Sequence, residues 1–255
     1  MDESVSRKVT GKSVAVTQTH RGHGASTMSY YLARVFVSLN LRVLLVDLTS
    51  RHERLLSLTR RGPTKNLVLW MPPLARSRDA APALEQARIQ TAGKADVILI
   101  DADASLIEEL GTGALGIDYT CVLTEATKAG QDTADRLAER LHDEEPPRGR
   151  VGAIFSRVDA PSANELPEQT ETRHLPVLGY FPADYLLAGG DAYSLKGGEP
   201  TWPHDTYLYA ILRIGQKLGR IVPLERSREP NGSDISGAHV SPMDGRYPRS
   251  EERAI

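Results

Sequence analysis

The chain has 255 residues, of which 40% are hydrophobic, so it can bury a core and fits one large domain better than a fibrous or repeat array. Lys and Arg number 31 against 33 Asp and Glu, and the formal net charge of -2 excludes a global basic field that would attract nucleic acid or anionic lipid. The single cysteine, Cys121, excludes an internal disulfide framework and a cysteine-based zinc cluster, and its apolar surroundings predict a small buried hydrophobe.

The two ends of the chain differ from its middle. Residues 1–12 are polar, and residues 225–255 mix Pro, Gly, Ser and both charge signs, which predicts two tails around one domain at residues 13–224. The N-terminus lacks the charged and then apolar pattern of a signal segment, and no apolar run approaches the roughly 20 residues that cross a bilayer. We therefore expect a cytoplasmic protein without a transmembrane segment, peripheral to the membrane at most through a partner.

Short β-branched runs alternate with helical stripes along the middle of the chain. The runs predict buried strands at residues 13–18, 42–47, 96–101, 119–123, 150–156 and 177–181. Apolar spacings of three and four predict helices at residues 28–39, 83–91, 132–141 and 207–218. This alternation predicts an α/β fold with a mainly parallel sheet that helices cover on both faces.

Two segments are less regular in their pattern. Residues 61–78 contain Pro63, Pro72 and Pro73, which favours an irregular excursion. The last helix, at residues 207–218, has an amphipathic stripe that also suits a membrane surface, but its continuity with the core favours packing against the sheet.

The segment after the first strand has the order of a phosphate loop. Residues 13–28 read SVAVTQTHRGHGASTM, which is a strand, a glycine-containing loop and the start of an amphipathic helix. Gly22 and Gly24 let the backbone turn its N–H groups onto phosphate oxygens, and the hydroxyl of Ser26 or Thr27 can ligate magnesium. The alternative is a purely structural turn, which glycine serves equally well.

With this loop the chain resembles the deviant Walker A ATPases of the ParA/MinD type and their relatives, the bacterial tyrosine kinases of capsule and exopolysaccharide export. The likeness covers roughly residues 13–220 and rests on motifs in order: the loop, RVLLVD at 42–47, DVILID at 96–101, VGAIFSRVD at 151–159 and LPVLGYFPAD at 175–184. The resemblance implies a three-layer P-loop NTPase fold with ATP and magnesium as cofactors.

The resemblance also implies a set of site residues. Nucleotide contacts are expected at His20, Arg21, Gly22, His23, Gly24, Ala25, Ser26, Thr27, Asp47, Asp101 and Ser156. Among these, Ser26, Asp47 and Asp101 are the expected magnesium-side residues. An aspartate at a strand end also serves to cap the following turn, so both roles stay open for Asp47 and Asp101.

Several positions depart from the family pattern. Ala25 stands where the family has its phosphate-binding lysine, His20 where it has its signature lysine, and Arg21 where it has a loop glycine. Thr49 replaces the usual second aspartate, and Ser156 replaces the asparagine that contacts adenine. Because phosphoryl transfer depends on positioned charge, these losses predict very slow hydrolysis or none, and no catalytic residue is assigned.

The loop histidines, His20 and His23, are also compatible with metal binding. No carboxylate, cysteine or third histidine lies near them in the sequence, so the pattern predicts solvated side chains rather than metal ligands.

The sequence therefore predicts a degenerate ParA/MinD-like protein that acts as a regulatory, nucleotide-sensing or pseudo-ATPase subunit. Its setting, cell-surface polysaccharide assembly or spatial positioning, is implied by resemblance alone. We expect a protein partner, either free or associated with the membrane, and a homodimer. The sequence carries no specific nucleic-acid signal. Two alternatives stay open: an active ATPase or tyrosine-kinase-like enzyme with substitute cations such as Arg21 or Arg51, and a nucleotide-independent interaction scaffold.

Overall fold

The computed structural model describes residues 11–50, 52–59, 65–74, 76–142, 150–158, 175–182 and 205–222. Almost all of the two expected tails lies outside these ranges. The described strands are β1 (Lys12–Gln18), β2 (Val43–Asp47), β3 (Leu67–Trp70), β4 (Val97–Asp101), β5 (Tyr119–Glu125), β6 (Arg150–Val158) and β7 (Val177–Pro182). They form one sheet in the order β3-β2-β4-β1-β5-β6-β7, and every neighbouring pair is parallel. The expected parallel α/β fold is confirmed.

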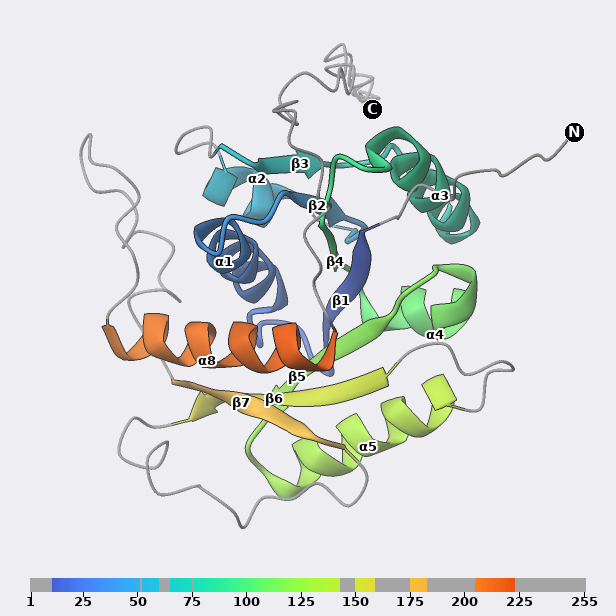
Figure 1. Ribbon diagram of the computed structural model, residues 1–255. Coiled ribbons are helices and arrows are strands. Elements are labelled where there is room, and N and C mark those ends of the chain that lie inside the picture. The colour runs from blue at the N-terminus through green and yellow to red at the C-terminus, as the bar shows by residue number, and fades with distance from the viewer. Residues whose placement is uncertain are drawn as a thin grey trace, which may run out of the picture.

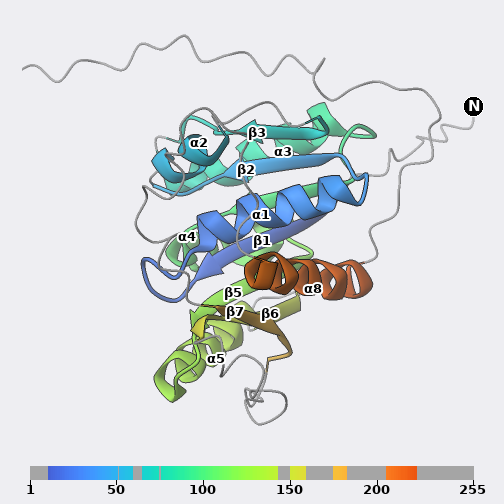
Figure 2. The same cartoon turned by 90° about the vertical axis from the view of Figure 1, so that its left-hand side faces the viewer.

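Helices cover both faces of this sheet, which gives three layers (Figures 1 and 2). One face carries α1 (Ala25–Ser38), α2 (Glu53–Thr59) and α8 (Asp205–Ile221). The other face carries α3 (Ala80–Thr91), which follows the short helix η1 (Ser77–Asp79), together with α4 (Ala104–Ala114) and α5 (Lys128–His142). A parallel sheet buried on both faces explains why its strands are continuous apolar runs rather than alternating ones.

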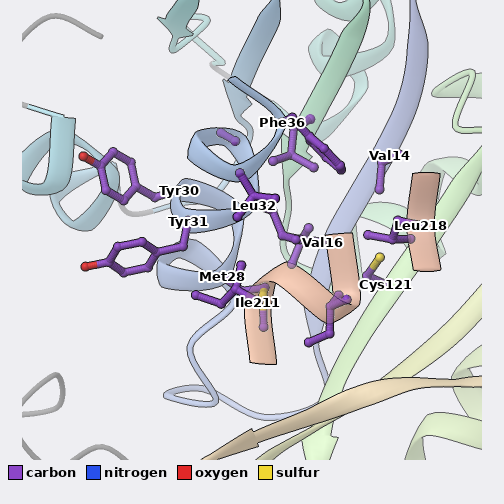
Figure 3. Close-up of a cluster of buried hydrophobic side chains, with 14 of the residues drawn as sticks. Val14, Val16, Met28, Tyr30, Tyr31, Leu32, Phe36, Cys121, Ile211 and Leu218 are labelled. Atoms are coloured by element: carbon purple, nitrogen blue, oxygen red, sulfur yellow. The ribbon is translucent and has the colours of Figure 1, made fainter. Parts of the chain in front are cut away.

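The central strand β1 shows how the two cores are divided. Val14 and Val16 pack under α1 and α8, while Ala15 between them packs on the opposite side, since successive side chains in a strand point to opposite faces. Figure 3 shows Met28, Leu32 and Phe36 of α1 in the first of these cores, and all three are fully buried.

Cys121 lies in the same core as Val16 (Figure 3). Its side chain is fully buried, and burial raises the pKa of its thiol far above the usual range. The expectation of a small buried hydrophobe is confirmed.

The last described helix packs as expected. Ile211, Ile214 and Leu218 of α8 are fully buried in the core shared with α1, and α8 also contacts β7. Within the described ranges, no helix is both long enough and apolar enough to cross a bilayer.

Three features differ from the sequence prediction. The supposedly irregular segment at residues 61–78 contains the edge strand β3, because Pro63 and Pro72 flank Leu67–Trp70 rather than interrupt it. The short helices α2 and α4 were not predicted. Leu39, predicted to belong to the buried stripe of the first helix, is half exposed. The reason is that α1 ends at Ser38 and Leu39 is its C-cap.

Candidate functional site

The loop between β1 and α1, the blue loop at the left of Figure 2, has a conformation that needs glycine. Gly22 has φ 89° and Gly24 has φ 96° and ψ 24°, which is left-handed backbone. Gly24 is the N-cap of α1, and its carbonyl accepts a hydrogen bond from the backbone N–H of Met28 at 2.8 Å. The predicted order of strand, glycine loop and helix is therefore present.

Two N–H groups of this loop already have a hydrogen-bond partner. The backbone N–H groups of Gly24 and Ala25 both donate to Oε1 of Gln18, at 3.1 and 3.3 Å. These are donors at a helix N-terminus, the place where a phosphate loop binds phosphate oxygens. The amide oxygen of Gln18 thus stands in for an anionic oxygen.

Gln18 was not among the residues that the sequence pointed to. It is the last residue of β1, six positions before Gly24. The signal that could have identified Gln18 was its long amide side chain at the end of the strand that leads into the loop.

The other side of the loop is held by β5. His23 is buried, with Nε2 3.3 Å from Oε1 of Glu125 and Nδ1 3.5 Å from Oγ1 of Thr19. The Thr19 hydroxyl in turn lies 3.1 Å from Oγ1 of Thr124. The prediction of a solvated side chain is wrong for His23, because Glu125 reaches it from a strand distant in sequence. His20 is exposed, as predicted.

Asp47 ends β2 and is fully buried. Its Oδ1 accepts hydrogen bonds from the backbone N–H of Thr49 at 2.9 Å and from the Thr49 hydroxyl at 2.6 Å. Its Oδ2 lies 3.1 Å from Nδ1 of His52. The carboxylate therefore caps its own turn, one of the two roles that the sequence left open.

Asp101 ends β4, is equally buried and lies opposite Asp47 in the register of the two strands. Within the described ranges, neither of its carboxyl oxygens has a partner in hydrogen-bond geometry. The pKa of Asp101 is raised to about 7, chiefly by desolvation and also by the charges of Asp47 and Asp103, while the nearby hydroxyls of Ser26 and Ser29 act in the opposite direction.

The magnesium-side residues fit the ion unequally. Ser26 is partly exposed in the first turn of α1 and lies near the unpartnered Asp101, an arrangement that suits the water shell of a magnesium ion. Asp47 fits less well, because Thr49 occupies its Oδ1, although its Oδ2, 3.1 Å from Nδ1 of His52, has no partner in hydrogen-bond geometry within the described ranges. A magnesium ion brought by ATP would neutralise phosphate charge beside Ser26 and Asp101. The described residues include no group of three or more His, Cys, Asp or Glu side chains that could hold a metal by themselves.

The remaining predicted site residues lie apart from one another. Thr27 is buried in α1, and Arg21 is exposed at the loop. Ser156 is buried in β6, where its hydroxyl donates to the carbonyl of Thr124 at 3.2 Å. That hydroxyl is already used within the sheet, so the adenine contact at Ser156 stays a prediction. Arg51, and the ends of the two late motifs, lie outside the described residues.

A cleft of about 700 Å³ opens beside the loop. The β1–α1 loop contributes His20 and Arg21, the β2–α2 loop contributes His52, and the segment before η1 contributes Arg76. The start of α4, including Asp103, forms the remaining wall. Such a position beyond the carboxyl ends of parallel strands is where folds of this architecture bind ligands.

No protein-family model matches this sequence, and no curated protein matches it. Solved structures do match its fold. The MinC:MinD cell division protein complex of Aquifex aeolicus aligns with a TM-score of 0.61 at 17% identity over 82% of this chain and 95% of that chain. The septum site-determining protein MinD of Pyrococcus horikoshii, complexed with Mg-ADP, aligns with a TM-score of 0.61 at 16% identity, over 83% and 97% of the two chains.

A third match comes from plasmid partition. A putative plasmid partition protein of Borrelia burgdorferi bound to AMPPNP aligns with a TM-score of 0.59 at 16% identity, over 83% of this chain and all of that chain. These likenesses span nearly the whole length of the matched chains. The chain therefore has the P-loop fold of the MinD and ParA ATPases.

Proposed function

We propose that this chain is a degenerate ParA/MinD-like protein that works as a nucleotide-sensing or pseudo-ATPase regulatory subunit. One observation carries the proposal: Gln18 occupies the N–H groups of Gly24 and Ala25, where the phosphates of a nucleotide would bind. A nucleotide must displace this side chain to enter the loop. Binding is therefore coupled to a rearrangement of the loop, which is what a sensor requires.

Hydrolysis is disfavoured by the side chains around the loop. Ala25 is a buried methyl group where the resemblance places a lysine. Thr49 provides no carboxylate, and its hydroxyl donates a hydrogen bond to Asp47. Each positioned cationic group contributes on the order of a thousandfold to phosphoryl transfer, so these losses suppress turnover strongly.

Two retained residues favour sensing over a nucleotide-independent scaffold. Asp101 is buried without a hydrogen-bond partner in the described part of the chain, which is costly unless a ligand completes it. Ser26 lies beside it in the first turn of α1. A pure scaffold has no need for such a pair, whereas a magnesium nucleotide would satisfy both.

The setting of this function is inferred from resemblance. The matched structures are named for cell division and plasmid partition, and one of them is a complex of MinD with MinC. We propose a role in spatial positioning or in cell-surface polysaccharide assembly, with a protein partner, as a homodimer in the cytoplasm that reaches the membrane only through that partner. Association in the presence and absence of nucleotide tests this setting by light scattering and affinity capture.

The nucleotide part is tested by thermal unfolding and phosphate release. Magnesium-ATP is expected to raise the melting temperature, since any ligand selective for the folded state does so, without measurable turnover. Gln18→Ala is expected to increase this shift, while Gln90→Ala, an exposed glutamine on α3, is the matched control. Turnover near about 1 per second would support the active-enzyme alternative. No shift in either protein would support the scaffold.

A further inference from the structure

The side of α8 that faces away from the sheet carries an aromatic residue and three cations. Its exposed members are Tyr209, Arg213, Gln216, Lys217 and Arg220. Steps of three and four residues place them on one side of the helix, with neighbours about 6 Å apart and a total length of about 16 Å. The opposite side of the helix is buried in the core shared with α1. We call the exposed set the α8 surface.

The cations of the α8 surface lie close together and lack counter-charges. The guanidinium of Arg213 lies over the ring of Tyr209, with its Cζ 5.8 Å from the ring centroid. Desolvation lowers the pKa of the Lys217 ammonium, and the positive charge of Arg213 lowers it as well. None of the three cations forms an ion pair with a carboxylate in the described part of the chain, and α8 has no acidic residue after Asp205. An anionic partner would relieve the repulsion between these like charges.

The α8 surface is firmly supported from beneath. The Lys217 ammonium donates to the carbonyl of Val177, the first residue of β7, at 3.2 Å. Gly215 lies against α1, where an added Cβ would come within 2.9 Å of Cγ1 of Val35. The helix, orange in Figure 1, therefore packs closely on both β7 and α1. A surface that is ordered before binding loses little conformational entropy when a partner docks.

The chemistry of the α8 surface favours an acidic protein segment over a membrane or a nucleic acid. An amphipathic helix binds a membrane by inserting its apolar face, but the apolar face of α8 is buried in the core. Strong nucleic-acid sites neutralise about 6 to 10 phosphates, whereas this surface has three cations on a chain with a net charge of -2. Tyrosine and arginine are enriched at the energetic centres of protein interfaces, and arginine binds carboxylates in a bidentate manner.

We propose that the α8 surface docks an acidic segment, rich in Asp or Glu, of a partner protein. Tyr209 supplies the apolar contact, while Arg213, Lys217 and Arg220 pair with the carboxylates. The inference rests on the protein partner of the proposed function, and it names the surface and the chemistry of that contact. Because α8 packs on α1, which begins directly after Gly24, the docked segment would lie one helix away from the glycine loop.

The proposal is tested by fluorescence anisotropy on the full chain without nucleotide or magnesium. The probe is a labelled oligoglutamate peptide with one central leucine, and the oligoglutamine peptide of the same design is its control. We expect only the acidic peptide to bind. Arg213→Glu should weaken this binding by at least about tenfold, because like charges then face each other. Tyr209→Ala should weaken it by about fivefold through lost apolar contact.

The matched control is Arg136→Glu, which makes the same charge change at an exposed arginine of α5 on the other face of the sheet. It should leave the binding of the acidic peptide unchanged. Since the titration contains no nucleotide, its failure is distinct from a failure of nucleotide sensing, which appears as a missing thermal shift with magnesium-ATP.

Other occupants of the α8 surface are tested with phosphatidylglycerol vesicles, with duplex DNA and by light scattering of the protein alone. We expect Arg213→Glu to leave all three measurements unchanged. The proposal is overturned if the acidic peptide does not bind, if Arg136→Glu weakens its binding as much as Arg213→Glu, or if Arg213→Glu abolishes binding to vesicles, binding to DNA or self-association.

Discussion

The ends of β2 and β4 lie side by side and carry the same residue in very different states. Asp47 and Asp101 are paired in register and are both fully buried. Thr49 donates two hydrogen bonds to Oδ1 of Asp47, whereas neither oxygen of Asp101 has a partner in hydrogen-bond geometry within the described ranges. Oδ2 of Asp47 also lacks such a partner, although Nδ1 of His52 lies 3.1 Å from it. Desolvation accordingly raises the pKa of Asp101 to about 7.

This difference shows what each strand end is built for. The turn after Asp47 folds back so that Thr49 satisfies one oxygen of that carboxylate. The segment after Asp101 leads into α4 without such a turn. One carboxyl oxygen of Asp103 in this segment accepts a hydrogen bond from the backbone N–H of Ser50. A buried carboxyl group without a partner destabilises the fold, and such groups cluster at functional sites. In the proposed function, a ligand would therefore meet the β4 side, next to Ser26.

The largest contrast is expected from removal of Asp47. Asp47→Ala leaves the backbone N–H and hydroxyl of Thr49 without their acceptor and removes the carboxylate beside His52, so the free energy of unfolding should fall by about 3 kcal/mol. Asp101→Asn removes a buried charge that desolvation disfavours, so at pH 8 it should leave the free energy of unfolding unchanged or raise it. Urea unfolding of both variants in EDTA measures these values. Equal losses would show that the two carboxylates are satisfied alike.

The next effect is a pH dependence that belongs to Asp101. Because its folded-state pKa lies above the unfolded value, the native state holds a proton that the unfolded chain releases, and stability falls as pH rises from about 4 to about 7. Between pH 5 and pH 8 this group should cost about 2 to 3 kcal/mol. The free energy of unfolding of Asp101→Asn relative to the unmodified protein should rise by that amount over the same interval. A difference independent of pH would contradict the raised pKa.

A smaller effect concerns the two loop N–H groups, of Gly24 and Ala25, that donate to Gln18. Ala25→Lys alone should change ATP binding little, because Gln18 still holds the N–H groups of the loop. Combined with Gln18→Ala, the same lysine should tighten magnesium-ATP binding by about tenfold through one charged hydrogen bond. Calorimetric titration of the two single variants and the double variant provides the comparison. If Ala25→Lys acts equally well with and without Gln18, the amide does not block the site.

The smallest effect should come from Thr49. Thr49→Val removes the hydroxyl that lies 2.6 Å from Oδ1 of Asp47 and keeps the backbone donor, so it should cost about 1 kcal/mol. Thermal and urea unfolding would detect this loss. Thr120→Val, a buried threonine of β5 whose hydroxyl has no described partner, is the control and should cost less.

Much of the architecture follows from local sequence patterns. The β-branched runs and helical stripes predict six of the seven described strands and four of the helices, because both periodicities depend on near neighbours in the chain. The edge strand β3 was missed because four residues between prolines carry little pattern. The helix α4 was missed as well. It is interrupted at Gly111, whose φ of 81° and ψ of 151° are not helical, so the sequence offers no long uninterrupted helical stripe there.

The sequence by itself determined the parallel α/β fold and the order of strand, glycine loop and helix, since both depend on residue type and on spacing along the chain. Only the tertiary structure decided that Gln18 fills the loop, that Glu125 reaches His23, and that Thr49 binds one oxygen of Asp47 while both oxygens of Asp101 lack a described hydrogen-bond partner. These outcomes depend on the directions in which loop side chains reach across neighbouring strands. Hydrogen bonds act over about 3 Å, and that proximity arises only when distant segments meet in the folded sheet.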